Sequence, residues 1–188
     1  GAATSLGLDV SGNLVAGSTV KGSEVVDAFD VGTVGSTYQG NGGNDAFNAT
    51  AVTQLENGAV WNTIDGGAGT DTVKVTANAI ALTDSNFAKM SNMEKLTTDG
   101  DAGAGAVTVT TGGFFDANFT NATVTMLGAD TDVMTYSGAT YTGNATIAIT
   151  SLGLGNAAAE DITVTTGAGN DTVTVTAAAW VGAAGAGS

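Results

Sequence analysis

The stretch Gly66–Thr76 (GGAGTDTVKVT) joins a glycine-rich turn to a strand-like run, and this combination decides the expected fold. Glycine tolerates positive φ angles, so the first four residues suit a tight turn that ends near Asp71. In the run that follows, Val73 and Val75 alternate with polar residues, which is the period-two pattern of a β-strand with one buried face. The stretch therefore predicts a turn that leads directly into a strand.

The same frame recurs four more times along the chain. Each unit has a turn, then an aspartate, then an apolar residue two positions later. The units are Gly22–Val31 (GSEVVDAFDV), Gly40–Thr50 (GNGGNDAFNAT), Gly66–Thr76, Leu127–Ser137 (LGADTDVMTYS) and Thr166–Thr176 (TGAGNDTVTVT), with Asp27, Asp45, Asp71, Asp132 and Asp171 followed by Phe29, Phe47, Val73, Met134 and Val173. The glycines let backbone carbonyls turn toward a cation, the aspartate supplies a carboxylate, and the apolar residue points inward.

Outside these units, further runs with the same alternation predict a chain that is nearly all β-strand. These runs are 72–76, 106–110, 122–126, 146–150, 162–166 and 171–176. The exception is Asp84–Leu96 (DSNFAKMSNMEKL), where apolar residues recur every three positions and Asp84 suits a helix N-cap. This segment predicts either one helix or a short helix followed by a strand from Glu94.

Gly66–Lys74 (GGAGTDTVK) matches the RTX calcium-binding nonapeptide G-G-x-G-x-D-x-U-x at every defined position. Gly40–Asn48 and Thr166–Thr174 each lack one glycine, and Leu127–Thr135 departs further. The chain therefore resembles proteins with RTX (hemolysin-type calcium-binding) repeats. The resemblance implies a right-handed parallel β-solenoid with Ca²⁺ held between neighbouring turns by carboxylates and backbone carbonyls. The candidate metal-site residues are Asp27, Gly43, Asp45, Gly67, Gly69, Asp71, Asp130, Asp132, Gly167, Gly169 and Asp171.

The spacing of the aspartates separates this chain from uninterrupted RTX blocks. Successive aspartates are 18, 26, 61 and 39 residues apart, and Thr98–Gly105 could supply a degenerate turn inside the longest gap. This pattern is more similar to bacterial S-layer and extracellular-matrix proteins that carry sparse RTX turns and leave the cell by the type I route. The resemblance implies a secreted, non-enzymatic structural protein at the cell surface that assembles with itself into a layer, filament or biofilm matrix. The alternative is a glycan- or surface-binding module of a large RTX adhesin, with cell-surface polysaccharide as its partner.

Composition excludes several other function classes. The 188 residues include 29 Gly but no Pro, Cys or His, and 18 acidic residues against 4 Lys give a net charge of −14. Without histidine or cysteine there is no imidazole base, no thiol nucleophile, no disulfide and no typical zinc site. The negative charge disfavours nucleic-acid partners, and no apolar run is long enough for membrane insertion. Stacked carboxylates repel until divalent ions screen them, so the charge also favours calcium.

The remaining predictions concern organisation and catalysis. We expect one solenoid domain over residues 1–188, as a processed subunit or a segment of a larger secreted protein, ending in an uncharged tail, Ala177–Ser188. The tail is either a linker or a strand added to a neighbouring subunit, with Trp180 as a contact residue. The pairs Asp99/Asp101 and Asp130/Asp132 have the form of an acid and base pair, but their sequence context offers no Arg or His and few aromatics to hold a sugar. We therefore expect no catalysis.

Overall fold

The fold is described over residues 9–10, 14–33, 35–56, 58, 61–100, 105–128, 133–151 and 162–177 of a computed structural model. Several predicted features lie outside these residues. They are Asp101, Asp130, Asp132 and, beyond Ala177, the tail with Trp180.

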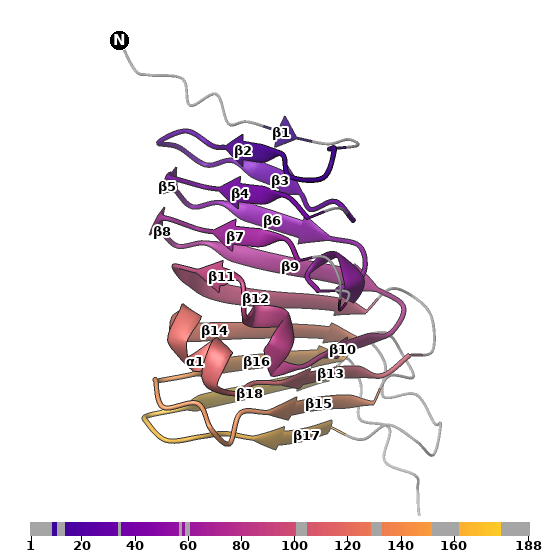
Figure 1. The fold of residues 1–188 in the computed structure, drawn as a ribbon. Helices are drawn as coiled ribbons and strands as arrows, with labels where there is room; N and C mark the ends of the chain where they lie inside the picture. Colours follow the sequence, from indigo (N-terminus) through magenta and orange to yellow (C-terminus); the bar gives the residue numbers. More distant parts are fainter. Residues whose placement is uncertain are drawn as a thin grey trace, which may run out of the picture.

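The chain is a parallel β-solenoid, as the sequence predicted, in which successive coils stack in chain order (Figure 1). One wall is an eight-stranded sheet in which each strand pairs in parallel with the next coil. Its strands are β1 (Asp9–Val10), β3 (Ala28–Asp30), β6 (Ala46–Ala49), β9 (Thr72–Ala77), β12 (Met93–Gly100), β14 (Phe119–Gly128), β16 (Thr146–Ser151) and β18 (Thr172–Ala177).

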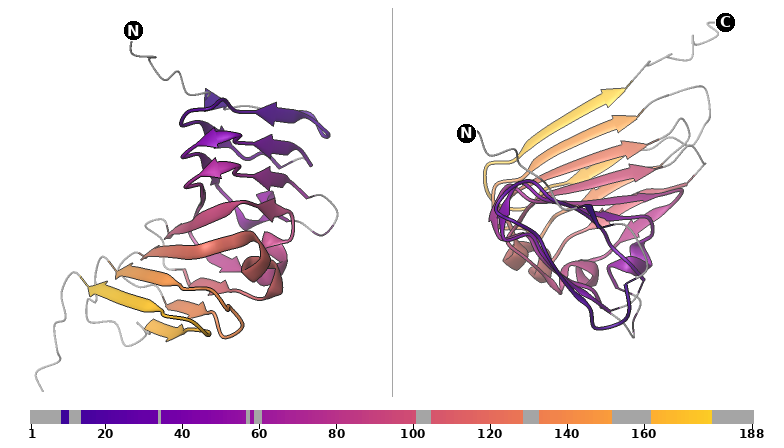
Figure 2. Two further views of the ribbon diagram at one scale, coloured as in Figure 1. Left: turned by 90° about the vertical axis from the view of Figure 1, so that its left-hand side faces the viewer. Right: turned by 90° about the horizontal axis from the view of Figure 1, so that it is seen from above.

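Two four-stranded parallel sheets form further walls, one along the N-terminal half and one along the C-terminal half (Figure 2). The first consists of β2 (Thr19–Lys21), β4 (Thr37–Gln39), β7 (Thr63–Asp65) and β11 (Met90–Ser91). The second consists of β10 (Ile80–Leu82), β13 (Val107–Thr110), β15 (Met134–Ser137) and β17 (Ile162–Thr165). A short pair, β5 (Gly42–Gly43) and β8 (Ala68–Gly69), links two of the turns.

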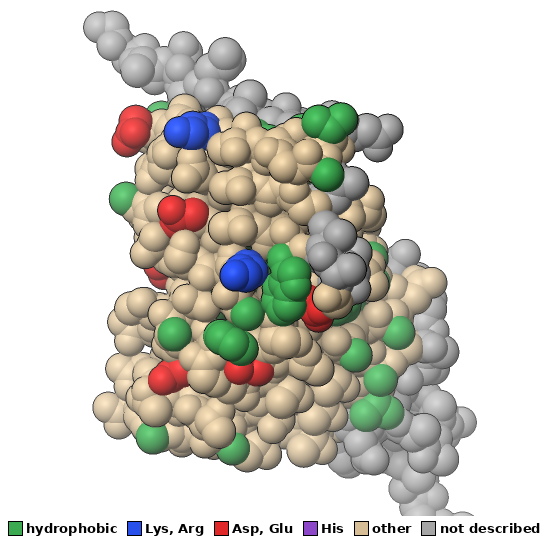
Figure 3. All heavy atoms as spheres, viewed as in Figure 1, with side chains coloured by type: hydrophobic (Ala, Val, Ile, Leu, Met, Phe, Trp, Pro, Cys, Tyr) green, Lys and Arg blue, Asp and Glu red, His purple; other side chains and the backbone are tan. Residues whose placement is uncertain are grey.

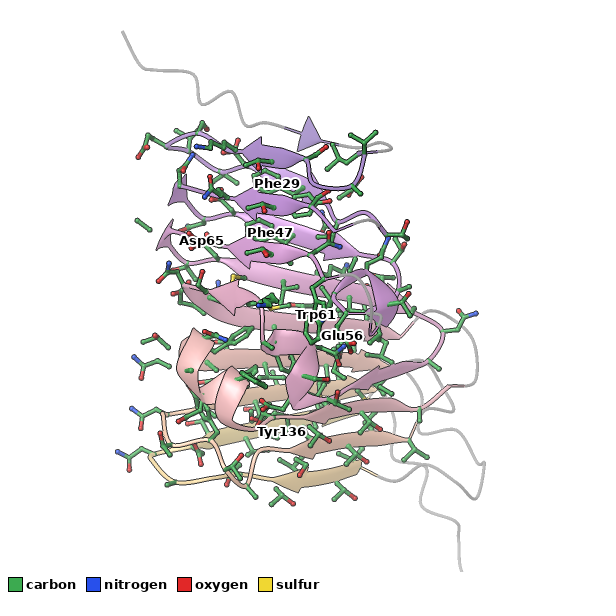
Figure 4. The ribbon with its side chains drawn as sticks, in the orientation of Figure 1. Phe29, Phe47, Glu56, Trp61, Asp65 and Tyr136 are labelled. Carbon is green, nitrogen blue, oxygen red and sulfur yellow. The ribbon has the colours of Figure 1, made fainter. Side chains whose placement is uncertain are left out.

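The core is built from columns of inward side chains, because the period-two alternation places every second residue of a strand between the walls. In the eight-stranded sheet one column runs through Phe29, Phe47, Val73, Leu96, Val124, Ile147 and Val173. The first six are fully buried, and the rings of Phe29 and Phe47 stack with centroids 4.9 Å apart (Figure 4). Val173 ends the column and is 44% exposed.

The segment 84–96 has the second of its two predicted forms, a short helix followed by a strand. Asp84–Phe87 forms a short 3-10 helix, η2, and a strand follows from Met93, one residue before the predicted start. The sequence did not predict the short helix α1 (Gly113–Asn118), whose first turn is held by Asp84. The Asp84 carboxylate accepts hydrogen bonds from the N–H groups of Phe114 (3.1 Å) and Phe115 (2.9 Å). A further 3-10 turn, η1, spans Val52–Gln54. No helix among the described residues is long and apolar enough to cross a membrane.

Candidate functional site: the stacked turns

The turns that precede the eight-stranded sheet stack their acidic residues in one row. Asp27, Asp45 and Asp71 each stand directly before a strand, Glu94 is the second residue of β12, and the four occupy one row of strands that pair in register. We call these four residues the carboxylate ladder. Asp45 Oδ1 accepts a hydrogen bond from the Asp27 N–H (2.8 Å), Asp71 Oδ1 from the Asp45 N–H (2.7 Å), and Glu94 Oε2 from the Asp71 N–H (2.8 Å). The carboxylates of Asp45, Asp71 and Glu94 therefore each satisfy a backbone donor of the preceding coil.

The ladder stops after Glu94 because the next two coils place alanine in the same row. The Ala122 N–H donates instead to the Tyr141 hydroxyl (3.0 Å), which in turn donates to Phe119 O (3.0 Å). The ladder geometry returns once, where Asp171 Oδ1 accepts from the Ala145 N–H (2.9 Å). The structure therefore brings Asp27, Asp45 and Asp71 together and leaves Asp171 apart from them.

The unit Leu127–Ser137 does not belong to this row. Its apolar residue Met134 begins β15, a strand of the C-terminal four-stranded sheet, whereas Phe29, Phe47, Val73 and Val173 lie in the eight-stranded sheet. The coil turn that corresponds to the aspartate frame is Gly143–Asn144–Ala145, which the sequence search missed because alanine replaces the aspartate. Asp130 and Asp132 themselves lie outside the described residues.

The second oxygens of the two central aspartates have no hydrogen-bond partner. Asp45 and Asp71 are 1% and 0% exposed, and the Oδ2 atom of each is buried and unpaired. Asp27 differs, because its Oδ2 accepts from the N–H (2.5 Å) and the hydroxyl (3.0 Å) of Ser23. Buried polar atoms without a partner are costly, and among the described residues these two Oδ2 atoms share that condition with Thr98 Oγ1 and the Tyr136 hydroxyl.

A backbone carbonyl oxygen lies close to each of these Oδ2 atoms. A Cβ atom placed on Gly40 would be 2.2 Å from both Asp45 Oδ2 and Gly66 O. A Cβ atom placed on Gly66 would be 2.2 Å from Asn92 O and 2.7 Å from Asp71 Oδ2. At each of these steps a carboxylate oxygen and a carbonyl oxygen of the next coil therefore lie beside the same glycine, at most 4.4 Å apart for Asp45 and 4.9 Å for Asp71. The Asp171 turn has Thr166 at the position of these glycines.

Burial makes the ionised form of these carboxylates unfavourable. Desolvation raises the pKa of Asp71 to about 6, and the charges of Asp45, Glu94 and Asp65 add to the rise, while the hydrogen bond from the Asp45 N–H opposes it. Desolvation also raises the pKa of Asp45, where the hydrogen bond from the Asp27 N–H lowers it and the Asp27 charge raises it further. The row is therefore a place where a proton or a cation is favoured.

The donor chemistry of the row fits a hard cation such as Ca²⁺. Calcium takes carboxylate and carbonyl oxygens, and both kinds converge beside Asp45 and Asp71. Among the described residues, however, no three acidic side chains gather into a group that could hold a metal ion. A calcium ion at a ladder step would therefore depend on one carboxylate and on backbone carbonyls.

The glycines of the motif have a structural reason that does not involve a metal. Gly43, Gly67, Gly69 and Gly169 have φ angles of 118°, 94°, 147° and 103°, which side chains rarely adopt. A Cβ atom on Gly69 would be 1.6 Å from Gly43 O, and one on Gly167 would be 2.0 Å from Tyr141 O. The close stacking of neighbouring turns therefore requires glycine at these positions.

The sequence search missed two further parts of the row. Glu94 completes the ladder although no glycine-rich turn precedes it. Beside the ladder, Asn44 Oδ1 accepts from the Thr70 N–H and Asn144 Oδ1 from the Asn170 N–H, each at 2.9 Å and across 26 residues. The pattern of Asn followed by Asp or Ala at 26-residue spacing marks Asn144 and Asn170, whereas Thr70 stands 26 residues after Asn44.

Other candidate features do not form comparable sites. Asp99, part of a predicted acidic pair, forms an ion pair with Lys74 (3.0 Å) on the outer face of β12 and β9. A pocket beside α1, lined by residues that include Asp116, Asn121 and Thr142, has a volume of about 210 Å³. This volume is below the usual range for small-molecule sites, so the pocket adds little support to a glycan-binding role.

The resemblance to RTX proteins therefore depends on the motif residues alone. No protein family, no curated protein and no solved structure matches the chain.

Proposed function

We propose that this chain is a non-enzymatic structural protein, a calcium-stabilised β-solenoid that assembles with copies of itself outside the cell into a layer, filament or matrix. The observation that carries this proposal is the pair of buried, unpaired Oδ2 atoms on Asp45 and Asp71, each beside a carbonyl oxygen of the next coil. Asp45 with Gly66 O would hold one ion, and Asp71 with Asn92 O would hold a second. Bound calcium supplies the positive charge that the row lacks.

The chain's own residues explain how such a site would act on the fold. Each carboxylate is already positioned by its Oδ1 hydrogen bond to the preceding coil, while its Oδ2 faces the following coil. A cation on Oδ2 would link the carboxylate to the carbonyl oxygen of the following coil, while Oδ1 keeps its hydrogen bond to the preceding coil. Sites with one carboxylate each are weak, which is consistent with the millimolar calcium of extracellular modules and favours a location outside the cell.

Thermal unfolding with and without calcium tests the metal part of the proposal. Two sites filled at ten times their Kd add about 3 kcal/mol, a rise in Tm of about 6–11 °C. We expect this rise in the wild type, about half of it in Asp71→Asn, and a much smaller rise with Mg²⁺, which requires stricter octahedral geometry. Asp30→Asn is the matched control, because Asp30 lies exposed in β3. An equal rise in Asp71→Asn and Asp30→Asn would rule out the ladder as the site.

Electron microscopy of the chain in calcium and in chelator tests the assembly part. We expect ordered layers or filaments in calcium and dispersed particles in chelator. If the chain stays monomeric in calcium while binding a cell-surface glycan, the adhesin-module alternative replaces this proposal.

A further inference from the structure

Among the described residues, no strand lies on the outer side of the C-terminal coil. β18 pairs with β16 and β17 pairs with β15, and each is the last strand of its sheet. In β18 the inward residues Val173 and Val175 are 44% and 50% exposed, whereas their register partners Ile147 and Ile149 are 0% and 1% exposed. Both the backbone edge and the end of the core column are therefore uncovered in the described part of the chain.

The backbone groups at this edge can be assigned from the pairing. The Thr172 N–H donates to Ala145 O (2.8 Å), so the backbone groups of Thr172, Thr174 and Thr176 face β16. By alternation, the N–H and C=O groups of Val173 and Val175 point away from β16, toward the open edge. The residues that expose apolar side chains are thus the same ones that offer unpaired backbone groups.

We propose that this coil docks against the same coil of a second copy, with two β18 strands antiparallel about a two-fold axis at Thr174. This inference rests on the proposed self-assembly and names its contact. The sequence Thr172–Thr176 (TVTVT) reads the same in both directions, so it is self-complementary, as an isologous interface requires. In this register Val173 lies opposite the partner's Val175, and each such pair exchanges two backbone hydrogen bonds.

The side chains agree with this register. The valines of both copies point inward and continue the core column across the junction, while Thr174 meets the partner's Thr174 on the outer face. β17 (ITVT) has the same alternation of apolar and polar residues.

Charge also favours a contact between like ends. Asp171 is the only charged residue among 162–177, in a chain of net charge −14. In Figure 3 the surface over β17, at the lower end, shows no acidic or basic side chain. Exposed edge strands normally carry charges or prolines that prevent pairing, and β18 carries none. The N-terminal end is less suited as a partner, because Phe29 is already fully buried there and the charged residues Lys21, Glu24 and Asp30 lie in the same part of the chain.

Cysteine cross-linking tests the two-fold contact, because the chain has no cysteine of its own. Thr174 pairs with itself at a non-hydrogen-bonded position, where the Cα atoms of two strands are about 4.5 Å apart, within disulfide range. We expect Thr174→Cys to form disulfide dimers in calcium at least about tenfold faster than Thr125→Cys, which lies two coils earlier in the same column. Thr172→Cys should cross-link with Thr176→Cys in a mixture, because these positions face each other in the same register.

The other outcomes contradict either the two-fold contact alone or self-assembly as a whole. If layers or filaments form but Thr174→Cys cross-links no faster than Thr125→Cys, the two-fold contact is wrong and self-assembly stands. If the chain stays monomeric and the Val173 and Val175 amides resist hydrogen exchange, residues 178–188 of the same chain cover the edge, and both ideas fail. Val175→Lys gives an independent check, because it should reduce association in sedimentation while leaving the melting of the monomer nearly unchanged.

Discussion

At the scale of single residues, the aspartate of the repeated turn uses its two oxygens differently. Oδ1 of Asp45 and of Asp71 has a structural task, since it accepts the N–H of the preceding coil. Oδ2 has no partner within the fold and lies beside a carbonyl oxygen. An aspartate in this motif therefore supports the stack with or without a metal, while a metal would bind through the second oxygen and the carbonyl oxygen beside it.

The raised pKa of Asp71 predicts that the metal-free protein becomes more stable as the pH falls from 7 to 5. The pKa is about 6 in the folded chain and 3.8 ordinarily, so in this window the folded state holds a proton that the unfolded state lacks. Protonation then favours folding, and this contribution is lost as the pH rises through 6. In chelator we expect the Tm to rise by several degrees between pH 7 and 5, and by clearly less in Asp71→Asn. A Tm that falls over this window in the wild type would contradict the prediction.

At the scale of elements, α1 depends on a residue from another coil. Asp84, at the start of η2, accepts the N–H groups of Phe114 and Phe115, and the rings of Phe87, Phe115 and Phe119 pack behind this contact. The carboxylate satisfies donors that a short helix leaves free at its N-terminus.

Replacing Asp84 with alanine should therefore lower the free energy of unfolding by about 1–2 kcal/mol. Chemical denaturation followed by circular dichroism measures this change. Ser85→Ala is the control, because the Ser85 hydroxyl contacts only the exposed Thr83 hydroxyl at 2.9 Å. Equal stability of the two variants would show that α1 is held by its aromatic packing alone.

The sequence predicted the strands better than the row of turns. Alternating valines and threonines located β9, β13, β14, β16, β17 and β18, because one buried face leaves a period-two pattern. The motif also located Asp27, Asp45 and Asp71. The motif grouped Met134 with Phe29, Phe47, Val73 and Val173, although Met134 lies in a different sheet. It also missed Ala145. Stacking requires only a backbone that fits the row, so the side chain there can be Asp, Glu or Ala. The helix α1 was missed because its stabilising partner lies about 30 residues away in sequence.

At the scale of the whole molecule, each coil contacts mainly its two neighbours, so stability should be graded along the stack. β9 and β12 lie between coils on both sides, whereas β18 has a neighbour on one side. In dilute chelated solution we expect hydrogen exchange to be slowest in β9 and β12 and fastest in β18 among strands of the eight-stranded sheet from β6 onward. Peptide-level mass spectrometry measures this. Uniform protection would instead show that the solenoid opens as a single unit.

The ladder also makes the two ends of the stack unequal during synthesis and truncation. Asp45, Asp71 and Glu94 each accept a hydrogen bond from a backbone N–H of the coil before them. A coil that has just been synthesised therefore lacks one hydrogen bond until the next coil has been synthesised. The Asp71 N–H, for example, has no acceptor until Glu94 has been synthesised, 23 residues later. Loss of coils from the C-terminal side of the ladder therefore orphans a buried donor, whereas loss from its N-terminal side only frees an acceptor. Two fragments of equal length, taken from opposite ends, would thus differ in how well they fold.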